Sequence, residues 1–256
     1  MGSDVNREVG AVRVGRVPFR VASVRRATEQ IIDSALGAEP ISVRFSNSYC
    51  VALASKDEQY AAVLSGSGVN YPDGTPVVWA MKRLRASRNS ETVRGPSVFL
   101  KVIDRGREYG IGHYLLGTTS STLDTLRGRL TSQYPGVRIV GSYAPPFVPI
   151  DEQFYQSCVR RISSTDSQIV WVALGTPKQD FVAHELSLRT GKVCVAVGAA
   201  FDFAAGTVRE APALIHNTGL EWIYRFACEP KRLWKRYTFG NLRFLYSVLR
   251  DTGRAQ

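Results

Sequence analysis

One stretch of sequence decides the expected fold: Trp171-Val172-Ala173-Leu174-Gly175-Thr176-Pro177-Lys178-Gln179-Asp180. The mostly apolar residues 169–173 predict a buried parallel strand, which breaks at Gly175. Thr176 is a favourable N-cap, and Pro177 suits the first position of a helix. The stretch therefore predicts a strand that opens directly into a helix.

A helix that starts at the end of a strand can hold a phosphate-bearing ligand. Its first backbone N–H groups lack partners within the helix and point toward the ligand. Lys178 and Gln179 add a cation and an amide that can face the same ligand. The same spacing also fits an ordinary connection between a strand and a helix.

Strand and helix patterns alternate along most of the chain. The expected strands are residues 41–45, 69–71, 113–116, 137–140, 169–174 and 193–197, and the expected helices are residues 27–36, 50–64, 75–84, 122–133, 151–162 and the segment after Pro177. Thr75 is expected to cap the third of these helices, with Pro76 in its first turn. The alternation predicts an α/β, Rossmann-like domain over residues 1–216, with a mostly parallel sheet covered by helices on both faces.

Ligands bind such sheets at the carboxyl ends of the strands. The expected ends are Asn47, Pro72-Asp73-Gly74, Gly117, Gly141, Gly175-Thr176 and Gly198. Residues 141–147 are expected to form a rigid loop on the same rim that shapes the pocket.

Composition and termini narrow the class of protein. The 256 residues contain no run of about 20 apolar residues, so no membrane-spanning helix is expected. Residues 1–7 lack an apolar segment behind them, which argues against a secretory signal. The four cysteines and three histidines lack the spacing of a zinc site, so we expect reduced cysteines and a cytoplasmic protein.

The net charge of +11 is concentrated near the end of the chain. Residues 225–256 hold eight basic and two acidic residues, a surplus of six. Nucleic acid, anionic lipid and a phosphorylated substrate are all compatible with this charge.

Residues 219–227 and 232–250 show helical spacing. In the second segment one side of the expected helix carries arginines and the opposite side carries apolar and aromatic residues. The arginines are Arg232, Arg236, Arg243, Arg250 and Arg254. The apolar and aromatic residues are Trp234, Tyr237, Leu242, Phe244, Leu245, Val248 and Leu249. This pattern favours a helix that lies in a membrane interface beside anionic headgroups. It also fits a terminal helix packed on its own domain. We expect residues 217–256 to form a basic helical appendage for membrane association.

Three polar residues at expected strand ends can carry chemistry. Asp73 follows a short apolar strand and can act as a general base in the ligand crevice, although Pro-Asp-Gly is also a common turn sequence. Asp202 lies between two phenylalanines and either binds hydroxyl groups of a ligand or caps nearby backbone. Asn47 can donate a hydrogen bond to a sugar or a base.

Several motifs are missing from the sequence. It has no phosphate-binding G-x-x-x-x-G-K-[ST] loop, no G-x-S-x-G elbow and no H-E-x-x-H. Gly110-Ile111-Gly112 lacks the third glycine of the dinucleotide fingerprint. No Asp-x-Asp pair is available to hold a metal on a nucleotide diphosphate. We therefore expect no cofactor and no metal, with backbone N–H groups, Lys and Arg meeting the charge of a diphosphate.

An ordered set of motifs over about residues 40–245 resembles the WecG/TagA/CpsF family of bacterial glycosyltransferases, glycosyltransferase family 26. The motifs are Asn47, Tyr71-Pro72-Asp73-Gly74-Thr75-Pro76-Val77-Val78-Trp79-Ala80, Leu115-Leu116-Gly117, Tyr134-Pro135, Pro145-Pro146-Phe147, Trp171 to Asp180, Val197 to Phe203, Gly206, Gly219 to Arg225 and Glu229 to Tyr237. Each motif alone is weak, and their order and spacing make the resemblance specific.

The resemblance implies an enzyme on the cytoplasmic face of the plasma membrane. Such enzymes transfer a sugar, a hexose or N-acetylhexosamine, from a UDP-sugar to a sugar on a polyprenyl diphosphate. They invert the anomeric centre without a metal and build teichoic acid linkage units, enterobacterial common antigen or exopolysaccharide. A homo-oligomer is compatible with the sequence, and no nucleic-acid partner is expected.

The resemblance also assigns roles to residues. Asp73 corresponds to the proposed base, Asn47 to the pocket asparagine, and Asp202 to the aspartate of Phe-Asp-Phe. Further substrate contacts are expected from Gly74, Thr75, Gly117, Gly175, Thr176, Pro177, Lys178, Gln179, Gly198, Arg225 and Arg232. The membrane-facing residues are expected to be Trp234, Arg236, Arg243 and Arg250.

Three positions depart from the family pattern. Phe45 stands where the family often has threonine, so a pocket hydroxyl is lost unless Ser46 or Ser48 replaces it. Thr92 and Ser97 stand where we expect the arginine and aspartate around the glycine equivalent to Gly95, although Arg94 is close by. These changes bear on the identity of the sugars more than on the reaction. A catalytically altered relative that binds a nucleotide sugar is the alternative within the family.

Two alternatives lie outside the family. The high isoelectric point permits a non-catalytic nucleic-acid-binding protein, whose signature is aromatic and basic residues on an exposed sheet face. The strands here are expected to be buried on both faces, which disfavours that class. A nucleotide-sugar epimerase needs a nicotinamide cofactor, and the missing glycine fingerprint disfavours it.

Overall fold

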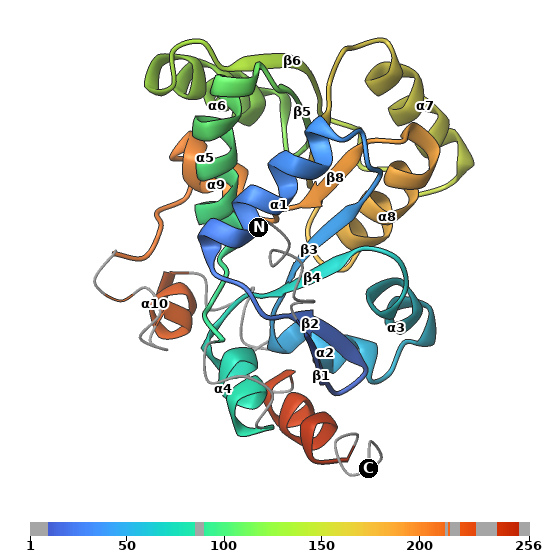
Figure 1. Cartoon of the computed structure of the whole chain (residues 1–256), viewed down its shortest axis with the longest axis vertical. Coiled ribbons are helices and arrows are strands. Elements are labelled where there is room, and N and C mark those ends of the chain that lie inside the picture. Colours follow the sequence, from blue (N-terminus) through green and yellow to red (C-terminus); the bar gives the residue numbers. More distant parts are fainter. Residues whose placement is uncertain (1–9, 85–89, 213–214, 216–220, 229–239, 251–256) are drawn as a thin grey trace, which may run out of the picture.

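The computed structural model describes residues 10–84, 90–212, 215, 221–228 and 240–250, except for the side chains of residues 221, 222, 225 and 228. Its centre is a six-stranded, all-parallel sheet in the order β4-β3-β8-β7-β5-β6 (Figure 1). The strands are β3 (Ser42–Ser46), β4 (Val69–Pro72), β5 (Gly112–Gly117), β6 (Arg138–Tyr143), β7 (Ile169–Ala173) and β8 (Val193–Ala196). The predicted parallel α/β fold is confirmed.

Helices cover both faces of the sheet. One face is covered by α1 (Val24–Leu36), α5 (Gly95–Gly106), α6 (Ser120–Gln133) and α9 (Ala200–Ala205), and the other by α7 (Glu152–Ser163) and α8 (Lys178–Thr190). Trp171 of β7 is fully buried, and its ring meets Phe99 of α5 edge-on at 4.9 Å. Because central strands are buried on both sides, they appear in the sequence as nearly continuous apolar runs.

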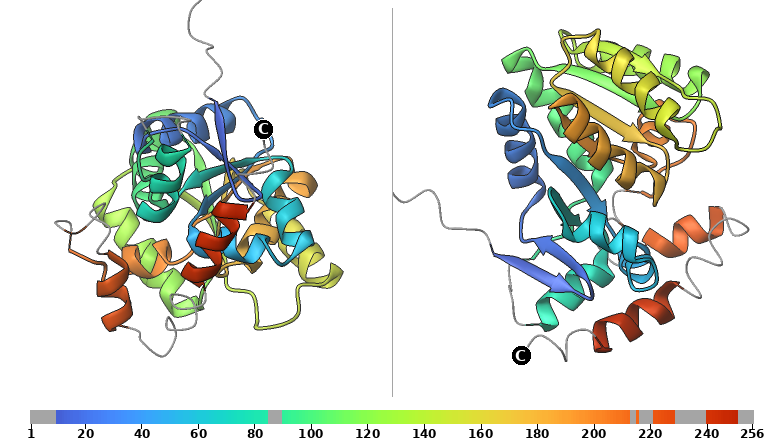
Figure 2. Two further views of the ribbon diagram at one scale, coloured as in Figure 1. Left: turned by 90° about the horizontal axis from the view of Figure 1, so that it is seen from below. Right: turned by 90° about the vertical axis from the view of Figure 1, so that its right-hand side faces the viewer.

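A separate apolar cluster lies beyond the main sheet. It joins the antiparallel hairpin of β1 (Ala11–Val14) and β2 (Val17–Arg20) to α2 (Ser48–Ala54), α3 (Glu58–Ser65) and α4 (Thr75–Arg83). Phe244 and Val248, from the helix at residues 240–250, complete this cluster. Figure 2 shows that helix beside the hairpin and α4 at one end of the molecule. The first and last described segments of the chain therefore pack together.

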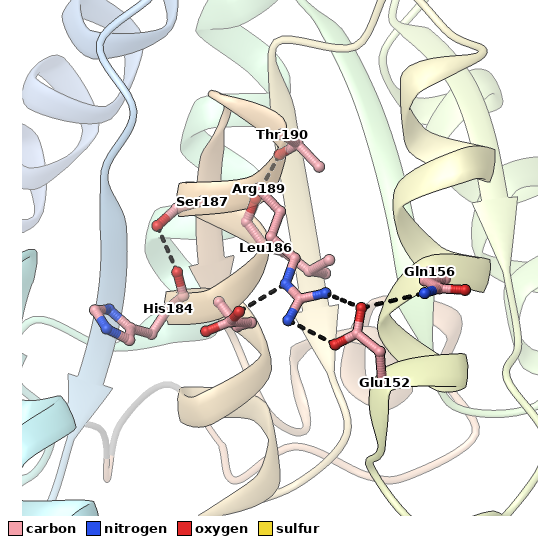
Figure 3. Close-up of polar contacts among 8 residues, drawn as sticks. Glu152, Gln156, His184, Leu186, Ser187, Arg189 and Thr190 are labelled. Atoms are coloured by element: carbon pink, nitrogen blue, oxygen red, sulfur yellow. Dashed lines mark hydrogen bonds and ion pairs between the residues drawn. The ribbon is translucent and has the colours of Figure 1, made fainter.

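An arginine on α8 joins the two helices of the second face. The guanidinium of Arg189 donates to both carboxylate oxygens of Glu152, at 2.7 and 2.9 Å, and to Glu185 at 2.6 Å (Figure 3). The Arg189 guanidinium also lies 4.8 Å from the ring centroid of Tyr155. These contacts hold α8 against α7.

Two expected elements differ from the structure in extent. Residues 50–64 form two helices instead of one, because Asp57 caps a new helix by accepting the Tyr60 backbone N–H at 3.0 Å. Gly141 was expected at a strand end and instead lies inside β6. A side chain there would meet the ring of Tyr114 at 2.5 Å, which explains the glycine.

Other elements were not expected from the periodicity. They are α5, the 3-10 helix η1 (Arg107–Tyr109), and α9, which was read as the end of an apolar run. The helix predicted over residues 219–227 is confirmed from residue 221 on by α10 (Glu221–Cys228), and residues 219 and 220 lie outside the described residues. The helix expected over residues 232–250 is described only for residues 240–250 and is helical there.

Within the described residues, no helix has the length and apolar character needed to cross a bilayer. Among them, too, no three His, Cys, Asp or Glu side chains are grouped so as to hold a metal ion. Cys50, Cys158 and Cys194 are buried among apolar side chains and carry thiol groups, not disulfides.

Candidate active site

Asp73 and Asn47 lie side by side at the carboxyl edge of the sheet. Ser46 of β3 pairs with Pro72 of β4. The residues that follow them, Asn47 and Asp73, are therefore neighbours across the two strands. The Asp73 backbone N–H donates to the Ser46 carbonyl at 3.0 Å. This bond extends the ladder by one residue beyond the strand and fixes Asp73 next to Asn47.

Helix α4 starts directly after Asp73. Gly74 is its N-cap, with φ +102°, a conformation that residues with a side chain rarely adopt. Thr75 is the first helical residue, so its predicted role as the cap is wrong by one position. The glycine turns the chain sharply and leaves the half-buried Asp73 at the rim.

Asn47 caps α2 with its side-chain carbonyl. Oδ1 accepts the backbone N–H groups of Tyr49 at 3.0 Å and Cys50 at 3.4 Å. The capping bonds fix the orientation of the amide, and Nδ2 is the donor that it can offer to a ligand. Asn47 is therefore a rigidly oriented amide on the residue that neighbours Asp73 at this edge.

The connection from β7 to α8 differs from the prediction. The Thr176–Pro177 peptide bond is cis, Pro177 is the N-cap, and α8 begins at Lys178. The expected Thr176 cap and the helical position of Pro177 are therefore wrong.

The backbone at the start of α8 is already largely bonded. The Gln179 N–H donates to the Gly175 carbonyl at 2.9 Å, and the Asp180 N–H donates to the Pro177 carbonyl at 3.0 Å. These amides were expected to serve a phosphate, so side chains have to supply more of any anion binding here than predicted.

The side chains of Lys178 and Gln179 connect neighbouring parts of the rim. The buried Gln179 amide packs beside Gly198, which follows β8, and its Oε1 has no hydrogen-bond partner among the described residues. The Lys178 ammonium lies 4.8 Å from the ring centroid of Phe147, in the loop after β6. Phe147 is 100% exposed, so this loop is part of the rim rather than of the core.

Gly117, at the end of β5, lies against the end of β7. Its φ is +125°, and a side chain there would meet the Ala173 carbonyl oxygen at 2.3 Å. The residues predicted at strand ends thus occupy one edge in the order Asp73, Asn47, Gly198, Gly175 and Gly117. Parallel strands are about 4.8 Å apart, so the edge from β4 to β7 spans roughly 14 Å.

Asp202 has a local structural role. It lies in α9, half-buried, and its carbonyl accepts the backbone N–H groups of Thr207 and Val208. Its carboxylate accepts the Thr207 hydroxyl at 3.4 Å. The carboxylate contact is with a side-chain hydroxyl and not with backbone, so both roles considered for Asp202 stay predictions.

Arg94 is a residue of the rim that sequence reasoning underrated. Its buried guanidinium pairs with Glu210 at 2.7 Å and contacts the Ser97 hydroxyl at 3.3 Å. The N–H of the preceding Val93 donates to the Pro72 carbonyl at 2.8 Å, which brings Arg94 close to Asp73. The signal that could have found it is Gly95-Pro96, since proline is typical of a first helical turn.

Gly95 also explains how Phe45 fits into the site. A side chain at Gly95 would lie 3.1 Å from the Phe45 ring. Phe45 is buried and stacks with Tyr71 at 5.9 Å between ring centroids. Phe45 therefore fills the space below the rim.

A buried charged group lies behind Gln179. Asp180 is 2% exposed, and its carboxylate accepts the Tyr60 hydroxyl at 2.7 Å. Burial raises the pKa of Asp180 to about 6, although the Tyr60 hydrogen bond and the Arg44 charge oppose this shift. Burial also lowers the pKa of Arg44 to about 10. Arg44 lies in β3 and Asp180 in α8, so this group links the strand that leads to Asn47 with the helix that carries Gln179.

The basic residues of the C-terminal region are only partly described. Arg243 and Arg250 are exposed on the helix at residues 240–250. Arg232, Trp234 and Arg236 lie outside the described residues, as does the side chain of Arg225 in α10.

Comparison with known proteins identifies a matching family and similar proteins. The model of the glycosyl transferase WecG/TagA/CpsF family matches residues 12–256. A Bacillus subtilis (strain 168) protein is 31% identical over 206 residues, which cover 80% of this chain and 77% of that protein. It is named N-acetylglucosaminyldiphosphoundecaprenol N-acetyl-beta-D-mannosaminyltransferase.

Proposed function

Because the chain belongs to the WecG/TagA/CpsF family of glycosyl transferases, we propose that it moves a hexose or N-acetylhexosamine from a UDP-sugar to a lipid-linked sugar. The acceptor is a sugar on a polyprenyl diphosphate, by analogy with the N-acetylglucosaminyldiphosphoundecaprenol in the name of the Bacillus subtilis relative. The product then serves cell-surface polysaccharide or teichoic acid synthesis.

The observation that carries this proposal is the placement of Asp73 beside Asn47. The backbone bond from Asp73 to Ser46 holds the main chain of Asp73 at the rim, and the α2 cap orients the amide of the neighbouring Asn47. A base and a hydroxyl-binding donor on neighbouring strand ends are what a sugar acceptor requires. Asp73 is half-buried, so part of it is accessible to a ligand.

In the proposed reaction, Asp73 takes the proton from the attacking hydroxyl of the acceptor sugar. The hydroxyl oxygen forms a new bond to the anomeric carbon of the donor while the bond from that carbon to the UDP oxygen breaks. UDP leaves with the bonding electron pair, and attack from the opposite face inverts the anomeric centre. Asp73 afterwards releases its proton to water.

The donor is held by the rim between β7 and β8. Lys178 supplies a positive charge near the diphosphate, and the Gln179 amide supplies hydrogen bonds beside Gly198. Thr176, Gly175 and Gly117 shape the same edge. We propose that no metal takes part, because the sequence lacks an Asp-x-Asp pair, and that Arg225 and Arg232 complete the neutralisation of the leaving group.

The proposed location is the cytoplasmic face of the plasma membrane, where a lipid-linked acceptor is presented. Residues 217–256 bring the basic surplus that attracts an anionic surface, with Arg243 and Arg250 exposed on the last described helix. Nucleic acid is not a proposed partner, and a homo-oligomer remains compatible with the proposal.

A donor screen tests this function. The purified chain is incubated with UDP-sugars and an N-acetylglucosaminyl diphosphate on a short prenyl chain, and UDP release is measured. UDP released only when acceptor and one donor are both present supports the proposal. Absence of UDP release with every UDP-sugar, or binding of a UDP-sugar without transfer, contradicts it and favours the catalytically altered alternative.

A further inference from the structure

Helix α4 leaves an aromatic and basic face in solvent. Its buried side, with Val77, Ala80 and Met81, belongs to the cluster around the hairpin. On the other side Trp79 is 53% exposed, and the neighbouring Lys82 and Arg83 are exposed as well. The Arg83 guanidinium lies 5.8 Å from the centroid of the Trp79 ring.

The helix at residues 240–250 likewise has one buried side and one exposed side. Phe244 and Val248 are buried against the cluster, whereas Leu242 and Leu249 are 70% and 75% exposed. Leu245 and Tyr246 are exposed between them, and the Arg250 guanidinium lies 5.9 Å from the Tyr246 ring centroid. Only part of its apolar surface therefore packs on the protein.

These two helices lie side by side. Both contribute buried residues to the same apolar cluster, and Figures 1 and 2 show them together at one end of the molecule. Each exposes large apolar side chains next to arginines. Tryptophan and tyrosine beside basic residues are typical of surfaces that lie in the headgroup region of a bilayer.

We propose that α4, through Trp79, Lys82 and Arg83, binds the anionic bilayer surface together with the helix at residues 240–250. The membrane-binding surface then includes the catalytic domain and is not confined to the C-terminal appendage. The positive charge of both helices complements anionic lipid, and their exposed apolar side chains supply the insertion. This inference rests on the proposed function in one respect, namely that the acceptor is lipid-linked.

The arrangement would fix the site relative to the bilayer. Asp73 lies two residues before α4, a helix of nine residues that spans about 13 Å. On the other side, the Asn241 side chain is 3.4 Å from the Ser48 hydroxyl, and a side chain at Gly240 would lie 3.4 Å from the Tyr49 ring. Ser48 and Tyr49 begin α2, which Asn47 caps, so both proposed membrane helices are tied to residues of the rim.

Vesicle partitioning tests the role of α4. The full chain is sedimented with phosphatidylcholine vesicles with and without 30 mol% phosphatidylglycerol, a composition chosen as roughly that of an anionic membrane. The matched variants are Trp79→Gln and Leu188→Gln, because Leu188 is also an exposed apolar residue but lies at the far end of α8. We expect Trp79→Gln to lower partitioning onto anionic vesicles about tenfold, or about 1.4 kcal/mol, and Leu188→Gln to leave it unchanged.

Quenching by brominated lipid gives a second measurement. In a Trp222→Phe/Trp234→Phe chain, Trp79 is the exposed tryptophan, since Trp171 is fully buried. We expect brominated vesicles to quench its fluorescence, and the further change Trp79→Phe to remove that quenching. Vesicle binding without quenching of Trp79 would overturn the inference.

The outcomes separate this inference from the proposed function. Unchanged partitioning of Trp79→Gln, with normal transfer to a short-chain acceptor, overturns the role of α4 and leaves the transferase proposal standing. Loss of self-association in Trp79→Gln, with unchanged partitioning, would instead identify the face as a contact between copies and would also overturn the inference. Normal vesicle binding without any transfer contradicts only the proposed function.

Discussion

The hydroxyl of Tyr60 donates to the buried carboxylate of Asp180 over 2.7 Å and joins α3 to the first turn of α8. Asp180 follows Gln179 directly, so this bond fixes the turn that presents the Gln179 amide to the rim. Arg44 provides the opposite charge from β3. The three residues form a rigid support between two parts of the candidate site.

Removal of the Tyr60 hydroxyl is expected to destabilise the protein. Tyr60→Phe leaves a buried carboxylate without its donor, which costs about 1–3 kcal/mol in free energy of unfolding. Chemical denaturation of Tyr60→Phe measures this loss. Tyr109→Phe is the matched control, since Tyr109 is half-exposed on η1, and its unfolding free energy should stay within about 0.5 kcal/mol of the native chain.

Asp180 should make stability depend on pH. Its pKa is about 6 in the folded chain, above the ordinary value of 3.8, so between these values the folded state binds more protons than the unfolded state. Stability should therefore fall as pH rises from about 4 to 6, by roughly 3 kcal/mol at most.

The variant Asp180→Asn, which keeps an acceptor for Tyr60, isolates this contribution. The difference in unfolding free energy between the native chain and the variant should change across that pH range and be flat above pH 7. A difference that is constant from pH 4 to 7 would show that the carboxylate titrates normally.

Replacement of the proposed base should abolish turnover and leave the fold intact. Asp73→Asn keeps the size of the side chain and the backbone bond to Ser46 but cannot accept a proton. We expect kcat to fall by about 10²–10⁴ with little change in UDP binding. Steady-state UDP release and calorimetry of UDP binding measure both quantities. Asp124→Asn, on the exposed side of α6, controls for the loss of one negative charge, and normal turnover of Asp73→Asn would remove Asp73 from the mechanism.

Gln179 should affect the donor more than the chemical step. Its buried amide lies beside Gly198, where the proposed donor lies, and its oxygen has no hydrogen-bond partner in the part of the chain that the structure describes. Gln179→Ala is expected to raise the KM for the UDP-sugar about tenfold and to change kcat less, since one or two hydrogen bonds to bound ligand are lost. Gln156→Ala, on the exposed side of α7, is the control. An unchanged donor KM would place the nucleotide elsewhere on the rim.

The sequence predicted the sheet well because its strands are buried on both faces. Residues 169–173 and 193–197 are apolar runs that can hardly be exposed, and a parallel sheet places all their carboxyl ends at one edge. That reasoning alone put Asp73 and Asn47 on the same rim. Their side-by-side contact needed the strand order, which no local pattern contains.

The features that were missed depend on contacts between distant residues. The hydrogen bonds within residues 175–181 use the backbone N–H groups that a simple helix start would leave available. Arg94 was underrated because its position follows from the Val93 to Pro72 bond and from Glu210, more than 100 residues later. The sequence also predicted a single apolar and aromatic side for the last helix. In the structure this side is split, because Phe244 packs on the hairpin cluster while Leu242 faces solvent.

Two glycines offer a matched test of the rim. Gly117 has no room for the side chain of alanine. Its φ is +125°, and an added Cβ would lie 2.3 Å from the Ala173 carbonyl oxygen. Gly117→Ala must therefore shift β5 or β7 and should lower the unfolding free energy by at least about 1–3 kcal/mol. Gly128, in the middle of α6, has open space around it, and Gly128→Ala should stabilise the protein by about 1 kcal/mol through helix propensity. Thermal or chemical denaturation of both variants gives the signs. Equal stability of the two variants would mean that the close approach of β5 and β7 at Gly117 does not exist in solution.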